Sequence, residues 1–291
     1  MPSLDALRRL ITAHAPGAGL DGITLSAVAG PTAPMLSTSR PRLAVVAQGA
    51  KRAILHDRTY DYAAGQFLVV TIDAPITGYV TEAPFLGFGM ELRPSVIASI
   101  LLDADLPRSV GTPPGMAVSD ADDDLLDAVV RLVRLAERPG DLRILGPMLE
   151  REVLWRLLTG AQGATVAQIG LADSNLTHVS RAIRWIRDHY AEALRVNDLA
   201  RLSGMSVSSF HRHFRAITAM TPIQFQKRIR LQQARALLAA SAGDVTSVGF
   251  VVGYDSPSQF SREYRRLFGA PPGQDAAHLR TTAPDAPLPI P

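Results

Sequence analysis

Two short stretches, fifty residues apart, repeat one pattern of serine, aromatic and arginine side chains. The first reads SVSSFHRHF from Ser206 to Phe214, and the second reads SPSQFSREY from Ser256 to Tyr264. In each stretch the first serine can cap a helix and the aromatic residues can face a core, which leaves the arginine outward. An outward arginine can bind both acceptors of a guanine edge. The pattern predicts two similar helices that read successive major grooves of DNA.

The outward side chains divide into expected base readers and expected phosphate contacts. We expect base contacts from Ser208, His211, Arg212, Ser258, Gln259 and Arg262. We expect contacts to phosphate, which position a protein without specifying sequence, from Arg215, Lys227, Arg228, Arg230, Arg265 and Arg266. Two alternatives stay open: Gln259 can form a capping box with Ser256, and Arg212 can bind phosphate alone. His211 and His213 have no carboxylate partner at ligand spacing, so we expect no metal there.

A turn with glycine precedes each capping serine, as in a helix-turn-helix. Ala200 lies four residues before Gly204, and Gly249 lies four residues before Gly253. A small residue at this place lets the second helix cross the first closely. Glycine inside a helix costs about 1 kcal/mol relative to alanine, which a close crossing would justify. The second turn is one residue longer, so the two copies are related but not identical.

The chain around the two copies is predicted to be helical. Helices are expected over 177–190, 196–202, 206–216, 221–240, 244–252 and 256–267. The helix over 221–240 spans roughly 30 Å, close to the length of about 34 Å of one turn of B-DNA. Residues 174–280 hold 15 Lys and Arg against seven Asp and Glu, whereas the whole chain has a net charge of only +3. Concentrated positive charge also favours a nucleic-acid partner.

The first third of the chain reads as strands punctuated by glycine, proline and aspartate. Strands are expected over 23–28, 43–48, 53–56, 66–72, 78–82 and 86–92. Many short strands predict a small barrel or sandwich. Two amphipathic helices follow, over 122–137 and 142–158, and form a hairpin. We expect the hairpin to bury its second face against another subunit, through Leu145, Leu149, Glu152, Val153 and Arg156.

At these residues the chain resembles the AraC/XylS family of bacterial transcription regulators. The resemblance rests on VNDLARLSGMS, SSFHRHF, TPIQFQKRIRLQQARALL and VGYDSPSQFSREYRRLFGAPP. It implies seven helices with two helix-turn-helix units, and it puts the expected base readers at base-facing positions. One departure is Gly249, where the family usually has alanine. The stretches EAPFLGFGMEL and LLDAVVRLVRL resemble, more weakly, a cupin-like sensor domain with a helical dimer interface.

The resemblance implies a multi-domain protein with both α and β structure. A cupin-like β-barrel (about 20–92) and the hairpin (about 122–158) would form an effector-sensing and dimerisation domain over 1–160. A linker over 161–175, an all-α DNA-binding domain over 176–280 and a disordered tail over 281–291 would follow. The expected partners are double-stranded DNA, a second copy of the chain and, for an activator, RNA polymerase. Activation is favoured over repression by the resemblance alone.

The strand region offers aromatic and soft apolar side chains for an effector. We expect a pocket lined by His56, Tyr60, Tyr62, Phe67, Tyr79, Phe88 and Met90, although most of them can equally fill the core. An apolar lining favours an aldehyde, an alcohol or an aromatic compound. His56 has no second histidine nearby, so we expect no metal, no cofactor and no enzyme activity.

Absent features exclude other classes of protein. The chain has no cysteine, which excludes disulfides, thiol catalysis and a cysteine-dependent repair protein. No apolar run reaches the roughly 20 residues that span a bilayer, and no signal peptide is evident, so we expect a cytoplasmic protein without a membrane partner. A constitutive regulator with a ligand-free barrel and a metal-dependent cupin enzyme fused to a DNA-binding domain stay open as alternatives.

Overall fold

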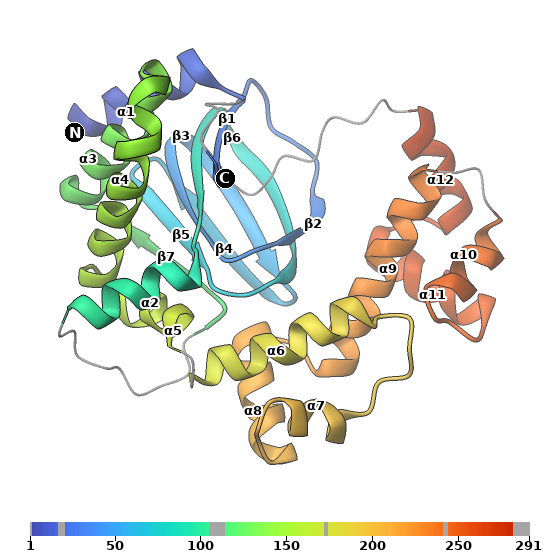
Figure 1. The fold of residues 1–291 in the computed structure, drawn as a ribbon. Coiled ribbons are helices and arrows are strands. Elements are labelled where there is room, and N and C mark those ends of the chain that lie inside the picture. Colours follow the sequence, from blue (N-terminus) through green and yellow to red (C-terminus); the bar gives the residue numbers. More distant parts are fainter. Residues whose placement is uncertain (1, 17–20, 105–113, 172–173, 241–243, 282–291) are drawn as a thin grey trace. The chain divides into compact units, whose positions relative to one another are not determined.

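The computed structural model describes residues 2–16, 21–104, 114–171, 174–240 and 244–281. The chain divides into two compact units, with the main boundary between His178 and Val179; Ala216–Ala219 group with the first unit. The first unit combines an antiparallel sheet with helices, and the second contains helices (Figure 1). The predicted fold class, a mixed α and β unit followed by an all-α unit, is confirmed.

One seven-stranded antiparallel sheet forms the centre of the N-terminal unit. Its strands are β1 (Ile23–Val28), β2 (Met35–Ser39), β3 (Arg42–Leu55), β4 (Arg58–Ala63), β5 (Gln66–Val70), β6 (Ala74–Glu91) and β7 (Met116–Asp120). The main path runs β1-β6-β3-β5-β7, while β2 pairs with β6 and β4 pairs with β3. The long strands β3 and β6 therefore connect all the others.

Strand β3 changes register against β6 between Val46 and Lys51. Such bulges add twist and bend a strand, which curls the sheet. Residues Leu43 to Ala47 are fully buried, although their side chains alternate between the two faces. Both faces of the sheet are therefore covered, and the two faces offer different chemical environments.

Helices cover one face of the sheet. These are α1 (Pro2–His14), α3 (Asp123–Arg134) and α4 (Pro139–Thr159), with α2 (Pro94–Asp103) and α5 (Gly163–Gly170) beside them (Figure 1). Helix α3 begins where Asp122 accepts a hydrogen bond from the Leu125 backbone N–H at 2.7 Å. Helix α4 packs along α3, so the two form the predicted hairpin.

The N-terminal unit differs from the sequence prediction in several places. Strands β2, β4 and β7 were not predicted, and the strands expected over 43–48 and 53–56 both belong to β3. Helix α1 was not predicted, although Leu4, Leu7 and Ile11 recur at helical spacing and are buried. Strands expected over 78–82 and 86–92 belong to one strand, β6. The segment predicted as a linker, 161–175, contains α5. A Cβ on Gly170 would lie 2.7 Å from the Ile97 side chain, so the small residues of α5 permit close packing on α2.

The second unit contains seven helices within its described residues. They are α6 (Asn175–Asp188, whose first turn precedes the boundary), α7 (Val196–Leu202), α8 (Val207–Thr218), α9 (Pro222–Ala240), α10 (Val245–Val251), α11 (Pro257–Phe268) and α12 (Pro272–Thr281). The predicted helices match the first six, and α12 was not predicted. The predicted tail, 281–291, lies outside the described residues except for Thr281.

Candidate nucleic-acid interface and ligand cavity

Helices α7 and α8, and again α10 and α11, form two helix-turn-helix units with matching turns. Gly204 and Gly253 adopt positive φ angles of 63° and 92°, which glycine tolerates best. The Met205 N–H donates to the Ala200 carbonyl at 2.9 Å, and the Tyr254 N–H donates to the Gly249 carbonyl at 3.0 Å. The two turns thus share one hydrogen-bond pattern.

The predicted close crossing at Gly249 is confirmed. A Cβ on Gly249 would lie 3.0 Å from Cδ1 of Phe260, and Phe260 is fully buried. Helix α11 therefore crosses α10 closely enough for its first aromatic ring to occupy the place of a side chain. The Ser256 hydroxyl accepts from the Gln259 backbone N–H at 3.3 Å, which caps α11 as predicted.

Stacked aromatic side chains orient the two second helices. Phe210 and Phe214 of α8 are fully buried, and Phe214 meets Phe225 of α9 edge to face at 5.6 Å. Phe260 and Tyr264 of α11 are also fully buried, with ring centroids 5.6 Å apart. Burial of one side of each helix leaves its other side with polar residues.

The structure exposes most of the predicted DNA-contacting residues. The exposed residues are Ser208, His211, Arg212 and Arg215 on α8, and Ser258, Arg262, Arg265 and Arg266 on α11. Gln259, Lys227, Arg228 and Arg230 are half-buried. The exposed arginines can contact a nucleic acid without first leaving buried surroundings. The half-buried residues are packed against, or hydrogen-bonded to, other groups of the same unit.

The carboxylate of Glu263 accepts hydrogen bonds from three side chains of this unit. It accepts from Lys227 at 2.8 Å, from the Gln259 amide at 3.1 Å and from the Tyr254 hydroxyl at 2.9 Å. Burial acts against the charge of Glu263, but these hydrogen bonds keep its pKa below the usual value. The Gln259 side chain bonds Glu263 rather than the Ser256 backbone, which differs from the capping-box alternative.

The contacts of Arg230 differ from the predicted contact with phosphate. Its guanidinium donates to the backbone carbonyls of Tyr190, Ala191, Glu192 and Gly253 at 2.6 to 3.1 Å. These bonds tie the end of α6 to the turn of the second helix-turn-helix. Arg228 is also half-buried, and burial lowers its pKa. The sequence could not reveal this because Lys227, Arg228 and Arg230 are near neighbours on α9, and only the packing decides which of them face inward.

The predicted effector residues lie on two different faces of the sheet. Ile23 and Met90 line one pocket together with Leu132 of α3 and Leu142 of α4, so their face lies against the helices. Direct pairing places Phe88 opposite Val45, and Val45 opposite Phe67, on this same face. We call it the outer face of the sheet. Phe67, Phe88 and Met90 therefore fill the layer between sheet and helices.

The opposite face, which we call the inner face, carries Arg42, Lys51 and Tyr62. Lys51 pairs directly with Tyr62, and directly paired residues share a face. Tyr60, two residues away, shares that face, whereas Tyr79 bonds Arg52 on the other side and His56 lies in the turn after β3. The sequence prediction missed Arg42 and Lys51, because the bulges in β3 decide which face each residue takes.

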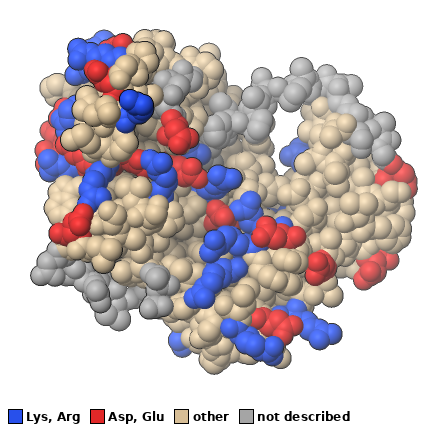
Figure 2. Space-filling view, viewed as in Figure 1, with Lys and Arg blue, Asp and Glu red and all other residues tan. Residues whose placement is uncertain are grey.

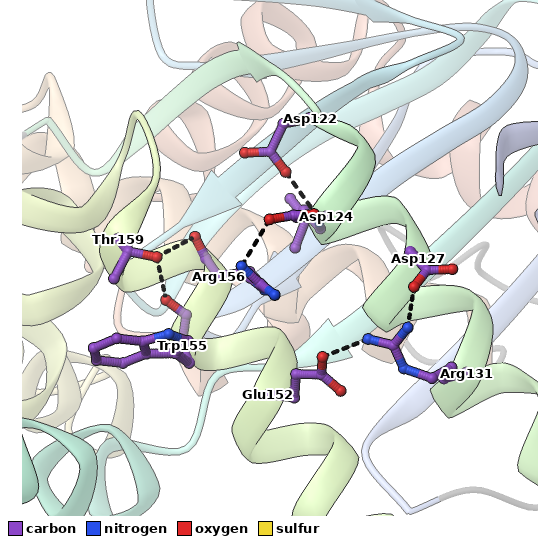
Figure 3. Close-up of polar contacts among 9 residues, drawn as sticks. Asp122, Asp124, Asp127, Arg131, Glu152, Trp155, Arg156 and Thr159 are labelled. Carbon is purple, nitrogen blue, oxygen red and sulfur yellow. Dashed lines mark hydrogen bonds and ion pairs between the residues drawn. The ribbon is translucent and has the colours of Figure 1, made fainter.

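Two residues predicted for a dimer interface contact the neighbouring helix of the same chain instead. Arg156 donates to Asp124 at 2.7 Å, and Glu152 accepts from Arg131, so both link α4 to α3 (Figure 3). Val153 is fully buried. Acidic and basic side chains are interspersed over the helices of this unit (Figure 2). Leu145, at 39% exposed, and the half-buried Leu149 complete the predicted set.

A different side of α4 carries exposed apolar residues. Ile144, Met148 and Trp155 are 64%, 63% and 37% exposed, and their spacing puts them on one stripe of the helix. Trp155 points away from α3 (Figure 3). We call these three residues the apolar stripe of α4.

The described residues contain neither a membrane-spanning helix nor a metal site. No helix there is long and apolar enough to cross a bilayer. No group of three or more His, Cys, Asp or Glu side chains in that part of the chain could hold a metal ion.

Residues 19–165, half of the 291-residue chain, match the family described as AraC-type transcriptional regulator N-terminus. The chain belongs to the AraC-type transcriptional regulators. Residues 199–277 of this AraC-type regulator also match a helix-turn-helix domain. The predicted family is confirmed.

Relatives of this AraC-type regulator include the HTH-type transcriptional activator RhaS. The chain is 31% identical over 163 residues to RhaS of Escherichia fergusonii, covering 54% of this chain and 58% of RhaS. It is 30% identical over 156 residues to RhaS of Salmonella arizonae, covering 52% and 56%. The chain thus spans somewhat more than half the length of these curated relatives.

The fold resembles that of ToxT from Vibrio cholerae. One ToxT structure superposes with a TM-score of 0.56 at 8% identity, over 88% of this chain and 97% of ToxT. Unsaturated fatty acid bound ToxT superposes with a TM-score of 0.52 at 8% identity, over 90% and 97%. At this identity the likeness concerns the fold.

Proposed function

We propose that this AraC-type regulator binds DNA in a sequence-specific manner and controls transcription, as an activator, under the influence of a small molecule. The observation that carries the proposal is the pair of helix-turn-helix units, each presenting exposed polar and cationic side chains on its second helix. Similarity to the activator RhaS supports activation, in which RNA polymerase would be a partner. Because its proposed partner is DNA, the protein would work in the cytoplasm. It would regulate transcription and would not act as an enzyme.

The exposed residues of α8 and α11 would make the DNA contacts. Ser208, His211 and Arg212 would meet base edges in one major groove, and Ser258 and Arg262 in the next. Arg215, Arg265 and Arg266 would bind phosphate. Gln259 would have to exchange its bond to Glu263 for one to a base, and Lys227 would have to leave the same carboxylate to reach phosphate.

The test compares two arginines of α11, Arg262 and Arg266. Arg262→Ala should weaken binding to the preferred site by about 1–3 kcal/mol and relax the base preference at one position. Arg266→Ala should weaken binding evenly across sequences and reduce its salt dependence by about one phosphate contact. Binding to a randomised DNA library at several salt concentrations measures both. Equal, sequence-independent losses for the two variants would contradict the base-reader assignment.

The inner face of the curled sheet would receive the small molecule. Apart from Tyr60 and Tyr62, the residues expected for the pocket lie elsewhere, so the cavity would be more polar than the sequence suggested. ToxT, which has the same fold, has been solved with an unsaturated fatty acid bound. A constitutive regulator without a ligand is the alternative, and the partnerless polar groups of this face argue against it.

The apolar stripe of α4 would form the dimer interface. Single exposed apolar residues are ordinary, but three along one helix stripe suit a second copy of the same helix. A dimer would place two DNA-binding units on two half-sites. The effector would then act by favouring one arrangement of these units over another.

A further inference from the structure

Three polar groups come together on the inner face of the sheet. Arg42, at the start of β3, bonds the Thr24 hydroxyl at 3.4 Å, while Lys51 lies near the other end of the same strand. Lys51 pairs directly with Tyr62 across β3 and β4, so these two side chains lie side by side on this face. The Lys51 ammonium lies 5.7 Å from the ring centroid of Phe85, beneath the curled sheet.

Each of these groups lacks a partner that its chemistry demands. Lys51 is 3% exposed and has no hydrogen bond or ion pair among the described residues. The Tyr62 hydroxyl and the Arg42 Nε are buried without a hydrogen-bond partner there. A buried cation without a counterion is strongly unfavourable. Burial first, and then the charge of Arg42, lowers the pKa of Lys51 to about 7.

The described part of the chain places no carboxylate against Lys51. Glu91 stands opposite Arg42 in the strand register and acts on its charge, but it also lies 3.4 Å from Arg40 at the edge of the sheet. Asp61 pairs with Arg52 at 2.5 Å on the other face. The inner face therefore holds two cations and the phenols of Tyr60 and Tyr62, with one shared carboxylate at its rim.

Space for a ligand opens beside these groups. A pocket of about 360 Å³ is lined by Thr24, Arg42 and Glu91 among others, and a small one of about 20 Å³ reaches Lys51. The larger volume lies in the range of pockets that hold small organic molecules. Ser26, Gly87 and Gly89 lie on this face in the strand register, so little side-chain bulk projects inward at these three positions.

We propose that the inner face binds the carboxylate of a small monocarboxylic acid. Lys51 and Arg42 neutralise it, and the Tyr62 hydroxyl donates a hydrogen bond to it, while an aromatic or short aliphatic body occupies the larger pocket. This inference rests on the proposed control by a small molecule and names the chemical class of the effector. Charge-assisted hydrogen bonds of this kind are among the strongest that proteins make.

The test measures binding of acids and of matched neutral compounds to the full chain without DNA. Benzoate, hexanoate and octanoate are compared with benzyl alcohol, benzamide and benzaldehyde by thermal shift and calorimetry. The acids should bind and raise the melting temperature, and the neutral compounds should not. At pH 8 binding should take up a proton, because a neighbouring anion raises the pKa of Lys51; calorimetry in two buffers of different ionisation enthalpy detects it. Equal binding of acids and neutral compounds, or no binding of any acid, would overturn the proposal.

Two variants locate the site. Lys51→Met keeps most of the side-chain volume and removes the buried charge, so it should fold and lose about a hundredfold in affinity for the acid. Tyr62→Phe should lose about tenfold. Unchanged affinity in Lys51→Met would overturn the assignment. DNA binding is measured separately on the same proteins: failure of acid binding with intact DNA binding rejects this inference alone, whereas failure of DNA binding rejects the proposed function.

Discussion

At the scale of single residues, the cations of the chain fall into two kinds. The arginines of α8 and α11 that we assign to DNA are exposed, so water solvates their charge until phosphate or a base replaces it. Lys51, Arg42 and Arg230 are covered instead, and only Arg230 has its donors satisfied by the protein. Both kinds contain the same types of residue. The surroundings of each side chain decide whether it can contact DNA, stabilise the fold or bind a ligand.

Lys51 should make the stability of the protein depend on pH. Below about pH 7 it is charged in both the folded and the unfolded state, so the full penalty of burying the charge applies. Between pH 7 and 10.5 the folded state holds fewer protons than the unfolded state, and stability rises with pH relative to a variant without this group. Lys51→Met should therefore be more stable than the wild type at pH 6, by about 1.4 kcal/mol for each unit of pKa shift.

Urea unfolding of both proteins at pH 6, 8 and 10 measures this difference. The advantage of Lys51→Met should shrink as the pH rises. A constant difference over this range would show that Lys51 keeps its ordinary pKa in the folded protein. Tyr62→Phe serves as the control, since it removes a buried hydroxyl from the same face and no charge.

At the scale of elements, the two turns before α8 and α11 use glycine for different reasons. Gly204 needs only its positive φ angle, since a Cβ there would meet nothing within 4 Å. Gly253 needs both its φ of 92° and its lack of a side chain, since a Cβ would lie 2.2 Å from the Ala191 carbonyl oxygen. The second turn is therefore packed against the link between α6 and α7, and the first is free.

The two glycines should respond differently to alanine. Gly204→Ala should lower the free energy of unfolding by about 1 kcal/mol, the strain of a left-handed residue with a side chain. Gly253→Ala should lower it by several kcal/mol, because backbone would also have to move. Chemical unfolding of both variants measures the difference. Similar losses would mean that the contact with Ala191 is loose in solution.

The sequence predicted the second unit better than the first for a physical reason. Helix caps, turn glycines and buried aromatics are local signals, so both helix-turn-helix units could be located from them. Helix α12 was missed because Pro271 precedes it and it begins with Pro272 and Gly273, which are residues typical of loops. In the sheet, Ala83 and Pro84 suggested a break, but β6 continues because the pairing with β3 is irregular there.

The faces of the sheet could not be predicted from alternation alone. A one-residue shift moves every later side chain to the opposite face, and β3 shifts register between Val46 and Lys51. The aromatic residues expected around a pocket were therefore divided between two layers. A lysine in a strand would ordinarily be assigned to the surface, so only the fold could identify Lys51 as buried.

At the scale of the whole molecule, the surfaces that we propose for sensing, association and DNA contact are separate. The inner face of the sheet, the apolar stripe of α4 and the outward sides of α8 and α11 share no residue. Each surface can therefore be altered without removing the others. This separation makes the proposed dimer testable by a change far from the residues assigned to DNA.

Met148→Asp should convert a dimer to a monomer in sedimentation velocity, because it places a charge in the middle of the apolar stripe. It should leave binding to a single half-site intact and reduce binding to a double site by about tenfold or more. Leu102→Asp is the matched control, since Leu102 is 88% exposed on α2 and lies outside the stripe. An unchanged mass for Met148→Asp would contradict the interface.

The bonds of Arg230 have a consequence for the DNA sequence itself. By joining residues 190–192, which lead from α6 into the first helix-turn-helix, to Gly253 in the turn of the second, they connect the entry to one helix-turn-helix with the turn of the other. The distance between α8 and α11 is then fixed by the protein. Each extra base pair rotates the next groove by about a tenth of a turn. Operators for this protein should therefore tolerate changes of base more readily than changes of spacing.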